Sequence, residues 1–118
     1  HSQQEEGSQD FVNQSILYMQ EHIGQSLTLE KLAAQVTVSA SHYSSIFRKR
    51  SGLSPIEYFN HLKIQRACQY LQFTDMRIKE IANRIGIDDP YYFSRLFTKV
   101  MSISPKEYRD RFICKNEK

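Results

Sequence analysis

Apolar residues recur three and four positions apart along most of the chain from residue 11 onward, which is the spacing of one helix face. Polar clusters containing Gly, Pro, Ser or Thr interrupt this pattern and mark the turns between helices. We therefore expect helices over residues 11–23, 29–35, about a dozen residues after 39, 54–72 and 78–84, with two more opening at residues 90 and 104. Residues 1–10 are polar without periodicity, and this indicates a disordered tail or an interdomain linker.

The longest of these segments, residues 54–72, carries its own start signals. Ser54 is a favourable N-cap, Pro55 suits the first helical position, and Glu57 stands where the acid of a capping box reaches back. Neither Gly nor Pro follows up to residue 72, and a helix of this length spans about 27 Å. Its apolar residues lie on several sides, so we expect it to contact packed material on several sides.

The chain contains the same unit twice, in residues 29–58 and again in residues 78–108. Both copies end in Ser-Pro-x-Glu-Tyr, and the second has one extra residue in its middle. The aligned apolar pairs are Leu32 with Ile81, Ala33 with Ala82, Val36 with Ile85, Val38 with Ile87, Tyr43 with Phe93, Ile46 with Leu96 and Phe47 with Phe97. Each copy predicts a short helix, a tight turn and a capped second helix, which is the helix-turn-helix pattern.

The predicted fold class is therefore all-α, with two helix-turn-helix subdomains joined by a long connecting helix. The expected parts are a tail or linker over 1–10, a first subdomain over 11–53, the connecting helix over 54–72, a second subdomain over 73–113 and a tail over 114–118. We expect Phe47 and Phe97 at the centres of the two cores. Tyr108, Phe112 and Ile113 are available to close the second core.

Charge is distributed unevenly along the chain. All 16 basic residues lie in residues 31–118, where they outnumber eight acidic ones, whereas residues 1–30 hold five acidic residues and no basic one. A basic body after an acidic start favours a polyanionic partner, although an ordinary solvated surface explains the charge alone equally well.

Several classes of protein find no support in the sequence. No apolar run is long enough to cross a membrane, and no signal-peptide pattern is present. The four His residues and the two cysteines, Cys68 and Cys114, match no metal-ligand or redox spacing, and no catalytic grouping or Gly-rich phosphate loop occurs. We expect Cys68 to be a buried thiol, and we expect neither an enzyme nor a cofactor.

The outward faces of the two capped helices carry hydrogen-bonding, cationic and aromatic groups. The first offers Ser41, His42, Ser44, Ser45, Arg48 and Lys49, and the second offers Tyr91, Tyr92, Ser94, Arg95, Thr98 and Lys99. A helix fits the DNA major groove, its leading end contacts base edges and its later basic residues meet phosphate. The connecting helix could hold two such readers about 34 Å apart, one turn of DNA. The alternatives are solvated helix faces, or an adaptor that anchors a partner protein through Tyr91 and Tyr92.

Residues 28–112 resemble the DNA-binding domain of the AraC/XylS family of bacterial transcription regulators. The resemblance rests on IANRIGIDDPYYFSRLF and SPKEYRDRF, which look like the family's IA…GF…YFSR.FK and SP..YR pattern. It implies sequence-specific binding of double-stranded DNA in the cytoplasm by a regulator, typically an activator, whose two recognition helices enter successive major-groove segments. It also implies two partners, RNA polymerase and an N-terminal effector or dimerisation domain, with residues 1–10 as the remaining linker.

The resemblance also carries site residues onto this chain. The implied base-reading residues are Ala40, Ser41, Ser44 and Ser45 in the first copy, and Pro90, Tyr91, Tyr92 and Arg95 in the second. The phosphate-contacting residues are expected to be Arg48, Lys49, Thr98 and Lys99. Three positions depart from the family pattern. Ser45 stands where Arg is common, Thr37 stands where Gly is usual, and Lys63 stands where Arg is frequent. A β-branched residue at Thr37 predicts a first turn built differently from the second.

Overall fold

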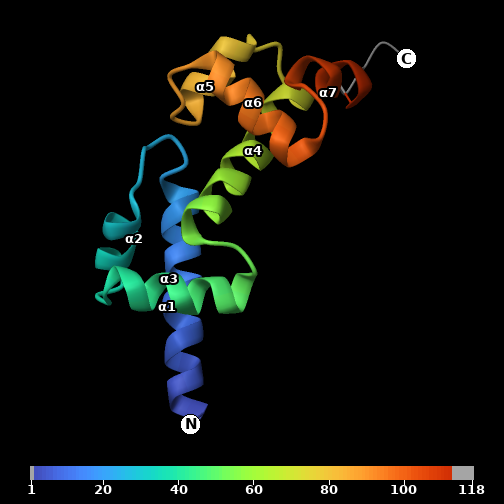
Figure 1. The fold of residues 1–118 in the computed structure, drawn as a ribbon. Coiled ribbons are helices and arrows are strands. Elements are labelled where there is room, and N and C mark those ends of the chain that lie inside the picture. The colour runs from blue at the N-terminus through green and yellow to red at the C-terminus, as the bar shows by residue number, and fades with distance from the viewer. Residues whose placement is uncertain (1, 113–118) are drawn as a thin grey trace. The chain divides into compact units, whose positions relative to one another are not determined.

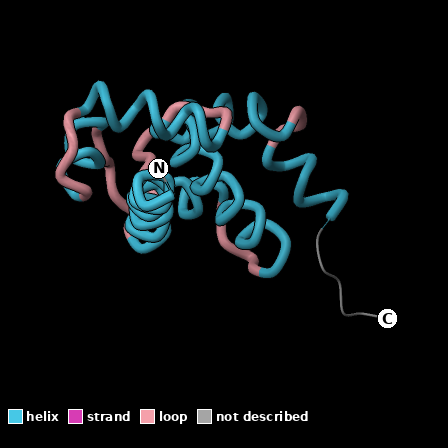
Figure 2. Tube along the Cα trace, turned by 90° about the horizontal axis from the view of Figure 1, so that it is seen from below, coloured by secondary structure: helices cyan, strands magenta, loops and turns pink. Residues whose placement is uncertain are grey.

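A computed structural model describes the backbone of residues 2–112 and the side chains of residues 11–112. Over that range the chain forms seven helices joined by short loops, and none of it is strand (Figures 1 and 2). The helices are α1 (Ser2–Glu21), α2 (Leu29–Gln35), α3 (Ala40–Ser51), α4 (Pro55–Phe73), α5 (Ile78–Arg84), α6 (Pro90–Met101) and α7 (Pro105–Phe112). The all-α class and the paired helix-turn-helix units are thus confirmed.

Helix α1 begins earlier than the hydrophobic pattern indicated. It starts at Ser2 rather than at Phe11, so residues 2–10 are helical rather than disordered, and their alternative assignment as an interdomain linker stays a prediction. The added segment is rich in Gln and Glu, which lose little side-chain freedom in a helix. Apolar periodicity reports which residues are buried, and a polar extension of a helix therefore escapes it. The expected tail over 114–118, with Cys114 and Ile113, lies outside the described residues.

The chain divides into two compact units. The first contains the residues up to Ile23 together with Leu27–Asn60, and the second contains Gly24–Ser26 together with the residues from His61 onward. Helix α4 starts in the first unit and ends in the second. Its buried residues recur every four positions, from Pro55 through Phe59 to Leu71. A helix turns every 3.6 residues, so this stripe drifts around α4, and different sides are buried along its length.

In the first unit, α3 packs against both α1 and α2, and it lies across α1 (Figure 1). Its inner side chains Tyr43 and Phe47 are fully buried, and the ring of Phe47 meets that of Tyr58 edge-on at 5.3 Å between centroids. The Tyr43 hydroxyl is hydrogen-bonded to the buried hydroxyl of Ser15 on α1. Burial raises the pKa of Tyr43 above its usual value.

In the second unit, α6 packs against α5 and α7 with the same arrangement of rings. Phe93 and Phe97 are fully buried, and Phe97 meets Tyr108 edge-on at 5.7 Å. The burial expected for Phe47 and Phe97 is therefore confirmed. Phe112 does not close this core as expected, because it remains 47% exposed, with its ring tilted by 42° against that of Tyr108 at 4.8 Å between centroids. Cys68 is half-buried rather than buried, and desolvation raises the pKa of its thiol.

The repeated Ser-Pro-x-Glu sequence forms the same capping box in both copies. The amide of Glu57 donates to the Ser54 hydroxyl, and the amide of Ser54 donates to the Glu57 carboxylate, at 3.2 and 3.0 Å. Ser104 and Glu107 make the equivalent pair at 3.2 and 3.1 Å. Two orphan amide groups at each helix start are satisfied in this way, so a four-residue motif sets where α4 and α7 begin.

The turns inside the two helix-turn-helix units are also alike, contrary to the expectation for Thr37. Thr37 has a φ of +57° and its counterpart Gly86 a φ of +81°. In each turn the next amide donates to the equivalent alanine carbonyl, Val38 to Ala33 and Ile87 to Ala82. Both are Schellman turns with a left-handed residue after the helix. Their shared hydrogen bonds hold Thr37 in a conformation that a β-branched residue rarely adopts.

Candidate functional site

The leading end of α3 is exposed and capped by its own chain. The Ser39 hydroxyl accepts a hydrogen bond from the His42 amide at 3.2 Å, which starts the helix there. Of the residues expected to read bases, Ser41 and Ser45 are exposed, whereas Ala40 and Ser44 are half-buried. This end therefore offers small groups, of which only the serine hydroxyls can hydrogen-bond.

The leading end of α6 carries larger groups. The Asp89 carboxylate accepts from the Tyr91 amide at 3.0 Å, and Pro90 occupies the first helical position, where its missing amide costs nothing. Tyr91 is 77% exposed and Tyr92 is 45% exposed. The exposed guanidinium of Arg95 lies over the ring of Tyr92, with 6.0 Å between Cζ and the ring centroid. Within the described part of the chain, no carboxylate forms an ion pair with Arg95.

The residues expected to contact phosphate follow one to two turns later. Arg48, Lys49, Thr98 and Lys99 are all exposed. Arg48, Lys49 and Lys99 stand in the last turn of their helices, where a cation also interacts favourably with the helix dipole. The Thr98 hydroxyl donates to the carbonyl of Ser94 at 2.8 Å. Because its one proton is already used, Thr98 is a poorer donor to phosphate than the three cations.

Lys63 supports the turn before α6, a role that the sequence did not reveal. Its side chain is only 4% exposed, and its ammonium donates to the backbone carbonyls of Gln25, at 2.8 Å, and Ile85. Burial lowers its pKa to about 8, because the charged form is separated from water. Beside it, Gly86 lies so close to Gly24 that a Cβ on Gly86 would be 2.7 Å from the Gly24 carbonyl oxygen. These four backbone positions fix the turn that leads into α6.

Arg109 performs a comparable task at the end of α4. Its guanidinium donates to the carbonyls of Leu71, Met76, Tyr70 and Thr74 at distances of 3.1, 2.7, 3.4 and 2.9 Å. The last carbonyls of a helix have no partner within the helix, and a cation there also complements the dipole. Arg109 of the Ser-Pro-x-Glu-Tyr-Arg stretch is thus a structural group rather than a DNA-facing one.

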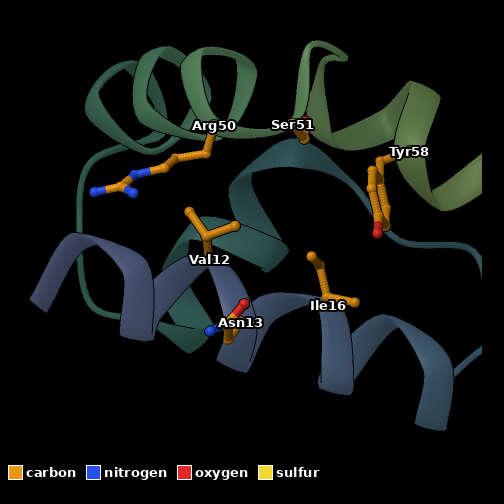
Figure 3. Close-up of a pocket in the computed structure, with 6 residues that line it drawn as sticks. All are labelled: Val12, Asn13, Ile16, Arg50, Ser51 and Tyr58. Carbon is orange, nitrogen blue, oxygen red and sulfur yellow. The ribbon is translucent and has the colours of Figure 1, made fainter. Parts of the chain in front are cut away.

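A pocket of about 410 Å³ lies within the first unit, between α1, the end of α3 and the start of α4 (Figure 3). Val12 and Ile16 project into it from α1, with Arg50 and Tyr58 on the opposite side. Ser51, which also lines it, already donates to the Leu53 carbonyl at 2.9 Å and accepts from the Leu53 amide at 3.1 Å. None of its described lining residues is among those expected to read bases.

Two absences limit the chemistry of the described residues. Among them, no group of three or more His, Cys, Asp or Glu side chains could hold a metal ion. No helix within residues 2–112 combines the length and the apolar character that crossing a bilayer requires.

Comparison with known proteins identifies the family. The profile of a family described as "Helix-turn-helix domain" matches residues 32–111. The MmsAB operon regulatory protein of Pseudomonas aeruginosa is 47% identical over 94 residues, which cover 80% of this chain and 31% of that protein. The chain thus spans about a third of the length of this curated relative.

Solved structures agree with this assignment. The C-terminal domain of AraT, a response regulator from Geobacillus stearothermophilus, superposes with a TM-score of 0.86 at 33% identity, covering 92% of this chain and 90% of that one. A transcriptional regulator from Chromobacterium violaceum, described as having an AraC-type DNA-binding domain, gives a TM-score of 0.84 at 27% identity, covering 93% and 98%. The proteins of this family are DNA-binding regulators rather than enzymes. This chain belongs to the AraC-type helix-turn-helix family of bacterial DNA-binding transcription regulators.

Proposed function

We propose that this chain binds a specific double-stranded DNA sequence by inserting α3 and α6 into successive major-groove segments. The main support for the proposal is that these two helices share the same pattern of capping, burial and exposure. Each is capped at its start, buries two aromatic side chains on its inner face and exposes polar or cationic groups at its leading end. The major groove presents a distinct donor and acceptor pattern for each base pair, and such groups can read it.

The two helices would contribute unequally to recognition. On α3, the exposed hydroxyls of Ser41 and Ser45 can bond several different bases, and the half-buried Ala40 and Ser44 add small contacts, so discrimination by α3 is modest.

On α6, Arg95 can make two hydrogen bonds to one guanine, a contact that is worth about 1–3 kcal/mol against a wrong base. Pro90, Tyr91 and Tyr92 precede it at the same leading end and address the neighbouring base pairs. We therefore assign most of the sequence preference to α6.

Phosphate contacts would supply the sequence-independent part of the affinity. Arg48, Lys49 and Lys99 place exposed cationic side chains at the ends of the recognition helices, and we retain Thr98 as a weaker contact.

The longer protein would act in the bacterial cytoplasm as a transcription regulator, typically an activator. Its further partners would be RNA polymerase and an N-terminal effector or dimerisation domain, to which residues 1–10 would lead. The length of the curated relative, of which the present chain matches 31%, supports the further domain, and membership of a family of transcription regulators supports the regulatory role.

Selection from a random pool of double-stranded DNA, followed by binding measurements at several salt concentrations, tests the proposal. We expect one enriched sequence, and an affinity that falls steeply as salt rises because bound phosphates release counterions. Lys49→Ala should weaken binding to all sequences alike and make the salt slope shallower by about one unit, whereas Lys49→Arg should leave the slope unchanged. If the selection enriches no sequence and the affinity for DNA does not change with salt concentration, DNA recognition is contradicted.

A panel of single-base-pair substitutions then tests the role of Arg95. We expect Arg95→Ala to remove the preference at one guanine and to leave the preferences at other positions intact. An equal loss of affinity for every member of the panel would assign Arg95 to the DNA backbone instead.

A further inference from the structure

Tyr92 and Arg95 lie one helical turn apart on the exposed leading end of α6. Their side chains contact each other rather than extending separately into solvent. We propose that Tyr92 is a positioning residue, which holds the Arg95 guanidinium in the orientation that reads a base pair. This inference rests on the proposed function, in which Arg95 contacts a guanine.

The geometry of the pair supports this role. The Arg95 Cζ is 6.0 Å from the centroid of the Tyr92 ring, within the range over which a ring face attracts a cation. Residues three apart on a helix are neighbours on its surface, so the contact needs no distortion of α6. An exposed arginine otherwise samples many rotamers, and fixing it on binding costs conformational entropy. A ring that already restricts the guanidinium lowers that cost.

Tyr92 is less exposed than its neighbour. The residue is 45% exposed, whereas Tyr91 is 77% exposed. No ring or cation contact is recorded for Tyr91 among the described residues. The two adjacent tyrosines therefore differ. Tyr92 would support Arg95 in addition to addressing its own base pair, whereas Tyr91 would contact DNA only.

The first copy of the repeat lacks this pair. His42 and Ser45 stand at the aligned positions of α3, and the ring of His42 lies 6.1 Å from that of Phe11 on α1. A helix without a long cation at this position needs no residue to orient it. The positioning pair thus accompanies the one helix to which we assign the specific guanine contact.

A double-mutant cycle on the DNA-binding chain tests the proposal, with the selected sequence and its substituted guanine as the two ligands. The readout is the ratio of the two affinities, which a general loss of stability would not change. In the presence of Arg95, Tyr92→Leu should lower this ratio about two- to five-fold, which corresponds to an exposed cation–π contact. Tyr92→Phe, which keeps the ring, should preserve the ratio.

The same Tyr92 substitutions are then measured in the Arg95→Ala variant, which shows whether Tyr92 acts through Arg95. There Tyr92→Leu should have no further effect on the ratio, because the group that it positions is gone. Tyr91→Leu serves as the matched control, and its effect should be the same with and without Arg95.

If Tyr92→Leu changes the ratio equally in both backgrounds, Tyr92 contacts DNA independently and the positioning role is wrong. The role is also wrong if Tyr92→Phe lowers the ratio as much as Tyr92→Leu. If Arg95→Ala alone leaves the ratio unchanged, the guanine contact of the proposed function fails as well.

Discussion

Replacing Gly86 by alanine probes the close approach of its backbone to Gly24. Gly86 has a φ of +81°, and a Cβ there would meet the Gly24 carbonyl oxygen at 2.7 Å, its carbon at 2.8 Å and the Lys63 ammonium at 3.0 Å. Real Cβ atoms essentially never approach backbone within 3.0 Å, so the segment at Gly24 must move. The variant therefore combines strain in its own backbone with displacement of a neighbouring one.

The expected loss can be assembled from these parts. A left-handed alanine costs about 1–2 kcal/mol, and forcing extra volume into a packed contact typically costs about 1–3 kcal/mol. Alanine also lowers the conformational entropy of the unfolded chain, which stabilises the folded state by about 0.4–1 kcal/mol. Gly86→Ala should thus lower the free energy of unfolding by about 2–4 kcal/mol.

Gly52→Ala is the matched control. Gly52 ends α3 with a φ of +83°, but a Cβ there would have no atom within 4 Å. Gly52→Ala has the same backbone strain and the same effect on the unfolded chain as Gly86→Ala. We therefore expect it to lower the free energy of unfolding by only about 0.5–1 kcal/mol. The difference between the two variants isolates the contact with Gly24.

Urea denaturation followed by circular dichroism measures the free energy of unfolding of both variants. Hydrogen exchange shows which helices lose protection. For Gly86→Ala, protection should fall first in α5 and α6. Equal losses for the two glycines would refute the reasoning, because they would mean that the backbone at Gly24 yields without cost.

Three further predictions concern the buried groups. Tyr43→Phe should cost about 1–3 kcal/mol by leaving the buried Ser15 hydroxyl without its partner, and a neutral effect in urea denaturation would indicate that the bond contributes nothing. Phe97→Ala should cost about 3–5 kcal/mol and reduce hydrogen-exchange protection mainly in the second unit, whereas uniform loss across both units would contradict separate cores. The free energy of unfolding should rise between pH 8 and pH 9.5, because the unfolded chain keeps the Lys63 proton to a higher pH than the folded chain does. Lys63→Met should remove this rise. If the dependence of the unfolding free energy on pH is the same in Lys63→Met, Lys63 is not its cause.

The local features of the fold were predictable because neighbouring residues determine them. The capping boxes at Ser54 and Ser104 depend on groups three positions apart, and the starts of α3 and α6 depend on Ser39 and Asp89 just before them. The inner faces followed from a repeated helical spacing that also placed Phe47. The start of α1 was missed because polar residues give no periodic signal.

In the candidate site, too, the sequence predicted some features and missed others. The resemblance to a family indicated which positions of α3 and α6 face outward, and the exposure of Ser41, Tyr91 and Arg95 agrees with it. The sequence did not distinguish Tyr92 from Tyr91, because both are tyrosines one turn from Arg95. Their difference in exposure and in contact with Arg95 depends on the directions that the two side chains take in the folded chain.

By itself, the sequence determined most helix boundaries, their caps and the duplicated unit, all of which depend on short spacings or on comparison of one copy with the other. Only the tertiary structure decided what holds the turns in place. Lys63 reaches the Gln25 and Ile85 carbonyls, Arg109 reaches the end of α4, and Gly86 meets Gly24. These partners lie from 22 to 62 positions apart along the chain, and no local pattern records them. Because buried backbone carbonyls must find donors wherever the packed helices leave them, such contacts appear only once the chain is folded.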